Sequence, residues 1–429
     1  MKLIFILGAL ALTLNQLAAA KTHNVICYYD TSSVMRTGPA NFTTQDLEIS
    51  LQLCTHIVYG YAAMRASTFE LVPGDKRQLP LFQQVNYLKK RFPHVKFLLS
   101  LGGNMDTKNR DKYMRLLESN RDQQRAFINS ALGFVRNYQF DGLDLAYQFT
   151  EDKPVMKESL FNKVYSAAKD KVISNLEGGK SQKKLVSVAE RRIQVTQLIG
   201  DLKQALRSSN LLLSLTVLPN VNASRYFNIP VIMGNLDFVT LATFDYSTPQ
   251  RTPKQADYLA PLQPLPANKL RNPYNNVDSQ VSYWLRQGAA ADKLNIGVAA
   301  HGRTWQFKKL LKSDKMPITS SLDGPAAGDL KTRRNGLLSW PEVCNNIKTM
   351  IKFEDKTLGN YAHRAPQVKG SSGLLITYEN VPSIGEKALY AKSHNLGGMA
   401  LFDLSLDDVH GECSGEKFTL LKTIRNKLI

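Results

Sequence analysis

The sequence predicts an α/β fold, a closed (β/α)8 barrel with a small inserted domain, and three observations support it. Short apolar segments alternate with longer segments of helical spacing, which is typical of βαβ units and a parallel sheet. Several short segments, such as 96–103, are almost continuously apolar, as strands buried on both faces are. The chain has 429 residues and 43% hydrophobic content, enough for one large core.

Eight segments rich in β-branched, aromatic or aliphatic residues account for the strands. They lie at 24–30, 55–64, 96–103, 140–149, 211–218, 237–246, 294–303 and 397–404. Helices are predicted from apolar residues at helical spacing at 80–91, 111–138, 191–208, 277–287 and 416–428. In the helix at 191–208, this spacing places Ile193, Leu198, Leu202 and Leu206 on one side. A doubly wound sheet is the alternative, but Asp30-Thr31-Ser32-Ser33 stands where its glycine-rich loop would follow the first strand.

Two segments do not fit this alternation. Residues 150–190 are long, polar and rich in lysine, and we interpret them as an extended loop over the C-terminal face of the barrel. Residues from about 304 to 378 are too many for a loop without structure of its own. They are therefore expected to fold as an insertion between the seventh strand and its helix.

The N-terminus has the features of a secretory signal peptide at residues 1–20. Lys2 supplies the basic region, Leu3 to Leu14 the apolar region, and Ala18 to Ala20 a small-residue cleavage site. Since no later run of about 18 apolar residues exists, we expect a secreted, extracellular and soluble protein without a membrane span.

The formal net charge is +19, from 55 Lys and Arg against 36 Asp and Glu. The basic residues are scattered, and a solvated surface is the favoured interpretation. Attraction to polyanions such as heparan-type glycans is the alternative. No segment resembles a nucleic-acid-binding motif, so nucleic acid is not an expected partner.

An even number of cysteines in a secreted chain predicts two disulfides, with three possible connectivities. The four are Cys27, Cys54, Cys344 and Cys413. No CxxC spacing occurs, so neither a metal site nor a cofactor is predicted. Two glycosylation sequons begin at Asn41 and Asn222, and Asn222 is the better candidate because it follows a strand end.

The strand at 140–149 is the candidate functional site. Its apolar residues alternate with Asp144, Ala146 and Gln148, and a period of two places these three on one face. A row of polar or very small residues on an otherwise apolar strand indicates a face that looks into a pocket. The alternative is the exposed face of an antiparallel strand.

This strand also resembles the active-site strand of the glycoside hydrolase family 18 chitinases, D-G-x-D-x-D-x-E. Asp141, Gly142 and Asp144 match, whereas Ala146 and Gln148 replace the last Asp and the Glu. In that family the Glu protonates the glycosidic oxygen, and the Asp before it orients the N-acetyl group that attacks the anomeric carbon. A glutamine amide has no such proton to give, and a general acid contributes about 10²–10⁴ in rate. The resemblance therefore implies a protein that is not an active enzyme.

The resemblance runs from Asn24 to the C-terminus. Four further segments match family motifs on the predicted strands: 100–103 (S-x-G-G), 242–245 (M-T-Y-D), 300–303 (F-Y-G-R) and 397–402 (G-G-x-M-V-W). It implies an inserted α+β domain at 304–380, between barrel parts at 21–303 and 381–429. It also implies the disulfides Cys27–Cys54 and Cys344–Cys413.

The same comparison suggests a weakened sugar groove. Its candidate residues are Tyr29, Tyr61, Asp144, Gln148, Asp245, Arg303 and Phe402, with Tyr59 a further candidate for its floor. Phe244 and Phe402 stand where the family has a tyrosine and a tryptophan, which removes a hydroxyl and reduces the area for stacking a pyranose. For Asp245 and Arg303, a buried structural ion pair is an equally good interpretation.

Within the family, the segments 145–149, 218–222 and 401–405 are most similar to the imaginal disc growth factors of insects. This resemblance implies a secreted chitinase-like protein that promotes cell proliferation through an unknown cell-surface receptor, often together with insulin. It also implies a role in chitin and cuticle organisation. The alternatives are a lectin-like binder of chitin or chito-oligosaccharides and a chitinase of low activity.

Overall fold

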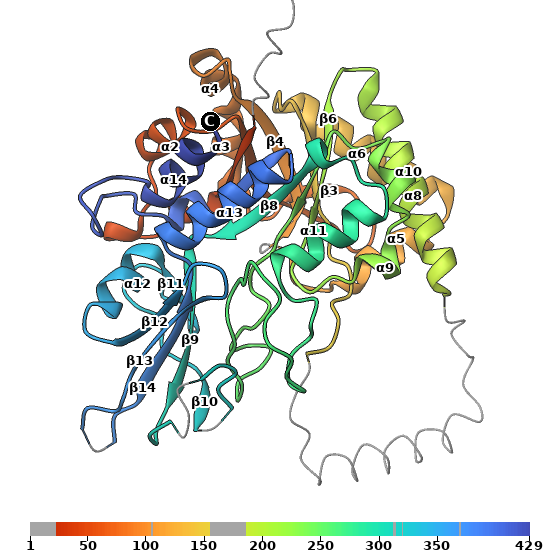
Figure 1. The fold of residues 1–429 in the computed structure, drawn as a ribbon. Helices are drawn as coiled ribbons and strands as arrows, with labels where there is room; N and C mark the ends of the chain where they lie inside the picture. Colours follow the sequence, from red (N-terminus) through yellow and green to blue (C-terminus); the bar gives the residue numbers. More distant parts are fainter. Residues whose placement is uncertain (1–22, 104–105, 155–185, 312–314, 320, 369) are drawn as a thin grey trace, which may run out of the picture.

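The structure, a computed structural model, describes residues 23–103, 106–154, 186–311, 315–319, 321–368 and 370–429. Eight parallel strands pair in the order β1, β2, β4, β5, β6, β7, β8 and β15, and β15 closes the barrel by pairing with β1 (Figure 1). A ninth strand, β3, runs antiparallel to β2 at 71–73. The predicted (β/α)8 barrel is therefore confirmed.

The barrel strands are β1 Asn24–Asp30, β2 His56–Met64, β4 Lys96–Gly102, β5 Gly142–Ala146, β6 Leu212–Val217, β7 Phe238–Leu241, β8 Leu294–Ala299 and β15 Gly398–Phe402. The helices around them are α2 Thr44–Leu51, α3 Leu79–Gln83, α4 Val85–Arg91, α5 Asp111–Glu118, α6 Arg121–Asn137, α8 Val188–Arg207, α9 Ala223–Tyr226, α10 Ile229–Met233, α11 Val277–Arg286, α13 Val381–Ser393 and α14 Thr419–Leu428. Short 3-10 turns lie at 31–35, 38–40, 76–78, 291–293 and 404–406.

Side chains on each strand alternate between the barrel interior and the layer under the helices. In β1, Ile26 and Tyr28 belong to the inner cluster, whereas Val25, Cys27 and Tyr29 belong to the larger core that the helices cover. The alternation follows from the two-residue period of an extended strand. It decides which residues of a strand can reach the functional end of the barrel.

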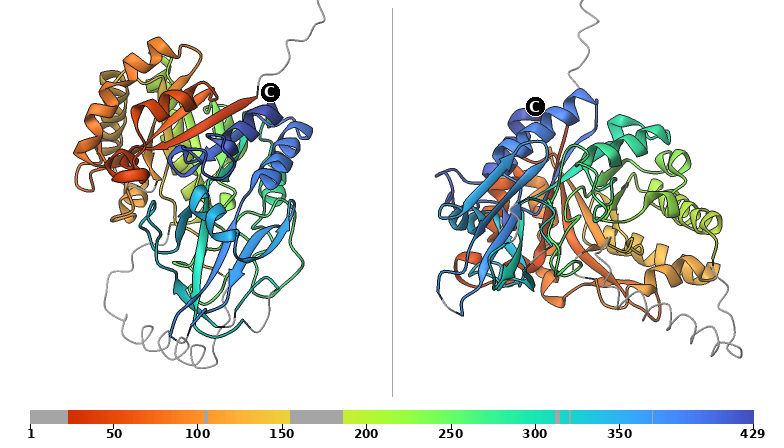
Figure 2. Two further views of the ribbon diagram at one scale, coloured as in Figure 1. Left: turned by 90° about the vertical axis from the view of Figure 1, so that its left-hand side faces the viewer. Right: turned by 60° about the horizontal axis from the view of Figure 1, so that its bottom comes forward.

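A second, antiparallel sheet extends from one end of the barrel (Figures 1 and 2). Its elements are β9 His301–Phe307, β10 Leu322–Pro325, β11 Leu337–Ser339, β12 Ile351–Asp355, β13 Gly359–Arg364, β14 Gly373–Tyr378 and helix α12 Trp340–Ile347. Trp305, Phe307 and Leu375 contribute to its own small core. The sheet begins at His301, three residues before the predicted start of the insertion.

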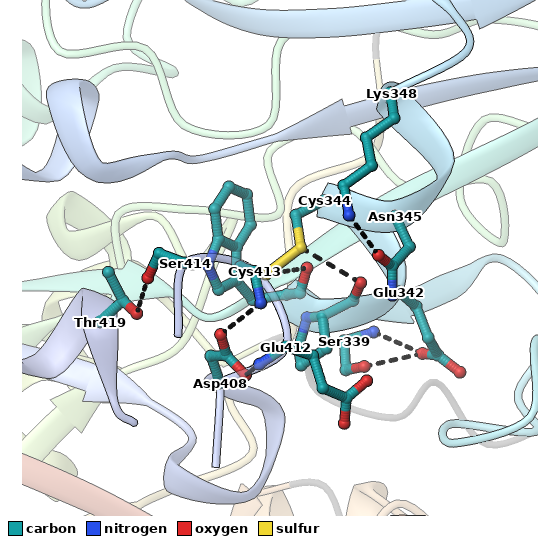
Figure 3. Close-up of a disulfide and its surroundings, with 12 residues drawn as sticks. Ser339, Glu342, Cys344, Asn345, Lys348, Asp408, Glu412, Cys413, Ser414 and Thr419 are labelled. Atoms are coloured by element: carbon teal, nitrogen blue, oxygen red, sulfur yellow. Dashed lines mark hydrogen bonds between the residues drawn. A yellow bond between two sulfur atoms is a disulfide. The ribbon is translucent and has the colours of Figure 1, made fainter. Parts of the chain in front are cut away.

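Both disulfides have the pairing that the family resemblance implied. Cys27 of β1 is bonded to Cys54, just before β2, and Cys344 of α12 is bonded to Cys413 in the segment before α14 (Figure 3). Asp408 accepts hydrogen bonds from the backbone N–H groups of Glu412 and Cys413 at 2.7 and 2.8 Å. The second disulfide thus fastens the inserted sheet to an ordered turn of the barrel.

Several predicted elements are shorter or divided. The helix at 111–138 is interrupted at Ser119, because the Asn120 side chain accepts the Gln123 N–H at 2.9 Å and begins a new helix. The helix at 80–91 is divided between α3 and α4, and the strands at 140–149 and 237–246 shorten to 142–146 and 238–241. Ile193 was predicted on the buried side of its helix, but its side chain is 57% exposed.

The predicted strand at 294–303 is divided at Ala300. The Ala300 N–H donates to the Phe402 carbonyl at 2.7 Å, and its own carbonyl accepts from the Trp340 N–H at 3.0 Å. Residues before this point belong to the barrel and residues after it belong to the second sheet. The predicted signal peptide at 1–20 and most of the predicted loop at 150–190 lie outside the described residues.

Removing the second disulfide should lower stability. It closes a 69-residue stretch, and such a crosslink contributes about 2–4 kcal/mol, chiefly by restricting the unfolded chain. The double variant Cys344→Ser/Cys413→Ser should lose about that amount in urea-induced unfolding. If the double variant unfolded at the same urea concentration as the unmodified protein with its disulfides intact, the structural role of this disulfide would be contradicted.

Candidate functional site

Asp144 occupies the interior of the barrel at the centre of a hydroxyl network. Its carboxylate accepts hydrogen bonds from Ser100 of β4 at 2.7 Å, and from Ser214 and Thr216 of β6 at 2.7 and 2.9 Å. Ser100, Asp144 and Ser214 stand opposite one another in the strand register, so the sheet itself brings them together. Burial raises the pKa of Asp144, and the three hydroxyl hydrogen bonds oppose that rise.

The network continues to β1 through Tyr28. Because Thr216 donates to Asp144, its oxygen is left to accept from the Tyr28 hydroxyl at 2.5 Å. The Tyr28 ring stacks on Phe402 with centroids 3.7 Å apart, and Phe402 also contacts Phe244 at 4.9 Å. Sequence reasoning missed Tyr28, although it shares the inward face of β1 with Ile26. These rings cover the inner floor of the barrel's C-terminal end.

The two positions that the sequence comparison singled out, Ala146 and Gln148, are both buried. Ala146 is 1% exposed at the end of β5, and Gln148 is 4% exposed just beyond it. The Gln148 amide nitrogen donates to the Gly103 carbonyl at 2.6 Å. The amide N–H satisfies this acceptor but has no titratable proton. The Gln148 side chain therefore links the segment that follows β5 to the segment that follows β4.

Gly102 and Gly103, part of the S-x-G-G segment, give this link its shape. Both have positive φ angles, +102° and +52°. A Cβ atom on Gly102 would lie 2.3 Å from the Ala146 carbonyl oxygen, and one on Gly103 would lie 2.2 Å from the Tyr61 ring. Tyr61 therefore lies against the same turn that holds Gln148.

Asp245 and Arg303 form a buried, two-pronged ion pair. Arg303 donates to both carboxylate oxygens at 2.8 and 2.5 Å, and His301 Nε2 lies 3.1 Å from one of them. Burial alone would raise the pKa of Asp245, but Arg303 and His301 hold it well below its usual range. The structure thus shows the ion-pair arrangement that the sequence left open.

Tyr29 does not reach this end of the barrel interior. It is 1% exposed and packs on the helix side of the sheet, with its ring centroid 5.1 Å from Tyr59 and 5.4 Å from Phe42. Its inclusion among the groove residues, and that of Tyr59, was wrong because consecutive residues of a strand face opposite sides.

A group of charged side chains that the sequence did not single out spans the loops after β4, β5 and β7. Glu151 is bound by Arg110 at 2.9 Å and by Arg251 at 2.5 Å, and Arg251 also donates to the Asp152 carbonyl at 2.7 Å. Burial lowers the pKa of Arg251, while Glu151, Asp152 and Asp245 oppose that shift. Glu151, three residues after Gln148, is therefore engaged by two guanidinium groups.

The two sequons lie on half-buried asparagines. Asn222 donates from its amide nitrogen to Asp152 at 3.1 Å, and its oxygen accepts from the Ser224 N–H at 3.1 Å. A glycan on Asn222 would have to replace the first of these contacts. Across the described ranges, no cluster of His, Cys, Asp and Glu is arranged to hold a metal ion. Nor does any helix in those ranges have the length and apolar character to span a bilayer.

Comparisons with known proteins assign the chain to a family. The model of the family "Glycosyl hydrolases family 18" matches residues 24–407, and the chain belongs to this family. It is 42% identical to chitinase-like protein Idgf3 of Drosophila simulans, over 98% of both chains. It is 40% identical to chitinase-like protein Idgf4 of Glossina morsitans morsitans, over 99% of both chains. The predicted resemblance to this group of chitinase-like proteins is confirmed.

Solved structures of the same fold include both a chitinase and a pseudo-chitinase. Catalytic domain 2 of the Ostrinia furnacalis Group II chitinase superposes with a TM-score of 0.74 at 26% identity, covering 95% of this chain and 96% of that one. Human YKL-39, described as a pseudo-chitinase with retained chitooligosaccharide binding, superposes with a TM-score of 0.73 at 25% identity, covering 95% and 99%.

Replacing Asp245 should test the ion pair through its pH dependence. Asp245→Asn leaves the half-buried Arg303 without a charged partner, so we expect a loss of up to about 3–5 kcal/mol at pH 7. Because the folded-state pKa of Asp245 is depressed, its stabilisation is present above about pH 4 and lost as the pH falls below that value. The difference in unfolding free energy between the unmodified protein and Asp245→Asn should therefore become smaller in acid.

Urea unfolding at pH 7 and pH 3 measures both effects. Glu416→Gln is the matched control, since Glu416 faces Lys422 at 3.5 Å on the surface and should change stability little. A loss in Asp245→Asn that stays constant across this pH range would refute the assignment.

Proposed function

We propose that this chitinase-like protein is catalytically inactive, is secreted, and acts as an extracellular growth factor. The observation that carries the proposal is the state of position 148. The Gln148 amide is buried and donates to the Gly103 carbonyl. The side chain at this position therefore stabilises the fold and has no proton to transfer. Ala146 offers no carboxylate beside it, and Glu151 is occupied by Arg110 and Arg251.

The growth-factor role is supported by similarity to the Idgf chitinase-like proteins along nearly the whole chain. In this proposal the protein acts on a cell-surface receptor, together with insulin, and contributes to chitin and cuticle organisation. In this proposal the signalling surface is separate from the strand end at 146–148, where Gln148 is engaged by the Gly103 carbonyl.

The purified protein should release no product from a fluorogenic chitotriose above a mock-purified control, yet should raise cell number in low-serum insect culture. The proliferative effect should increase when insulin is added. The matched control is the same protein with its disulfides reduced and alkylated. A flat dose response would remove the growth-factor role, and hydrolysis by the unmodified protein would remove the proposal of inactivity.

Binding of chito-oligosaccharides is a second candidate function, favoured by the partly exposed Phe402 ring at the barrel's end. The pseudo-chitinase YKL-39 is described as retaining such binding. An aromatic ring offers a flat apolar face to a sugar ring, as the family's tryptophan does at this position.

Calorimetric titration with chitotetraose should then give measurable heat, and Phe402→Ala should weaken binding about three- to tenfold through lost stacking. Tyr87→Ala, which removes an exposed ring from α4, is the control and should bind as the unmodified protein does. Unfolding midpoints of both variants confirm that they are folded. The absence of heat at millimolar sugar would exclude this function.

A further inference from the structure

A cavity of about 780 Å³ lies beside the C-terminal end of the barrel, and Asp152, Asn222 and Arg251 are among its lining residues. Its walls are the ends of β6 and β7, one face of α11, the connection 247–276 and residues 152–154 and 218–224. Gln148, Asp245, Arg303 and Phe402 are not among its lining residues. Its volume falls within the range of about 300–1,000 Å³ that is usual for small-ligand sites.

The outer wall of the cavity is held in place by polar contacts within the connection. Arg271 binds both carboxylate oxygens of Asp257 at 2.6 and 2.8 Å and donates to the Pro266 carbonyl at 3.1 Å. Gln255 donates to the Leu270 carbonyl at 2.9 Å, and Asn276 begins α11 by accepting the Ser279 N–H. A wall with this many internal contacts is preformed, so little ordering would oppose ligand binding.

The charges around the cavity favour an anion. Its two lining carboxylates are already paired, Asp257 with Arg271 and Asp152 with Arg225. Lys269 and Arg286 are exposed lining residues with no acidic partner in the part of the chain that is described. On the barrel side, Arg251 Nε is buried and has no hydrogen-bond acceptor among the described residues. Lys269 and Arg286 therefore carry positive charge that no carboxylate in the described part of the chain neutralises. Arg251 is already paired with Glu151 and offers only its Nε–H as a hydrogen-bond donor.

The remaining lining is suited to sugar rings more than to a purely apolar molecule. Tyr258, Tyr274 and Tyr283 present aromatic surface, and Tyr274 is 65% exposed. The amide side chains of Asn275 and Gln280 add donors and acceptors beside these rings. An apolar ligand would bury these polar groups without partners, which is costly. Hydroxyl groups on a ring would satisfy them.

We propose that this cavity binds a short acidic saccharide, whose rings lie on the tyrosines and whose carboxylate or sulfate groups are held by Lys269, Arg286 and Arg251. This site is independent of the proposed growth-factor role and of chito-oligosaccharide binding near Phe402. Its occupant is distinguished from chitin fragments by charge, since those are neutral.

Calorimetry with three tetrasaccharide probes tests the proposal on the full secreted chain. A hyaluronan tetrasaccharide carries carboxylates alone, a heparin tetrasaccharide carries carboxylates and sulfates, and chitotetraose carries neither. At least one acidic probe should bind, with weaker binding at higher salt. Comparing the two acidic probes shows whether carboxylate suffices or sulfate is required.

Three variants separate a built site from diffuse surface charge. Lys269→Gln/Arg286→Gln should weaken acidic binding at least about tenfold, because both charges contact the ligand. Tyr274→Ala, a change at an exposed residue, should weaken it about three- to tenfold without altering charge. Lys90→Gln/Lys96→Gln removes the same charge near the N-terminal end of β4, at the opposite end of the barrel, and should leave binding unchanged.

No heat with either acidic probe at millimolar concentration would overturn the proposal. So would an equal loss of affinity in the Lys90→Gln/Lys96→Gln control, or unchanged binding in Tyr274→Ala. None of these results depends on whether the protein stimulates cells, and the cavity variants should leave any chitotetraose binding intact.

Discussion

The burial of one carboxylate, Asp144, constrains the centre of this barrel. A buried carboxylate is costly unless it is hydrogen-bonded, and here Ser100, Ser214 and Thr216 supply the donors from the strands on either side. These partners exist only if β4, β5 and β6 keep their register. The network reaches Tyr28 and then Phe402, so it also joins the two strands at which the barrel closes.

The same constraint explains why the fold does not need carboxylates at positions 146 and 148. Asp144 serves the interior network, whereas the residues replaced by Ala146 and Gln148 lie at the strand's end. There Gln148 takes a structural hydrogen bond to Gly103. Charges nearby are balanced in pairs, Asp245 with Arg303 and Glu151 with Arg251. A carboxylate that is bound by a guanidinium group stays ionised and is a poor proton donor.

Sequence patterns predicted the barrel because eight strand segments alternate with segments of helical spacing, and period two correctly turned Asp144 inward. They did not locate helix ends at Asn120, where a single side-chain cap outweighs a continuous apolar pattern. Nor could composition show that β8 ends just before Ala300, which depends on backbone hydrogen bonds of Ala300 to Phe402 and Trp340 far along the chain. Tyr29 was misplaced because the nearly uniform apolar pattern of 24–30 does not distinguish the inward face, which carries Tyr28, from the outward face.

The charged contacts at the barrel's end depend on loops, and loops lack the hydrophobic periodicity from which strands and helices are predicted. Arg110, Glu151 and Arg251 come from three different connections. The closed barrel brings them into contact, and no local sequence pattern predicts that contact. The connection 247–276 uses Asp257 and Arg271 in the same way to hold a wall beside α11. The barrel positions such loops, because its strands are held in register by Asp144 and its hydroxyl partners. New binding surfaces can therefore arise in the connections while the strand core stays that of a hydrolase.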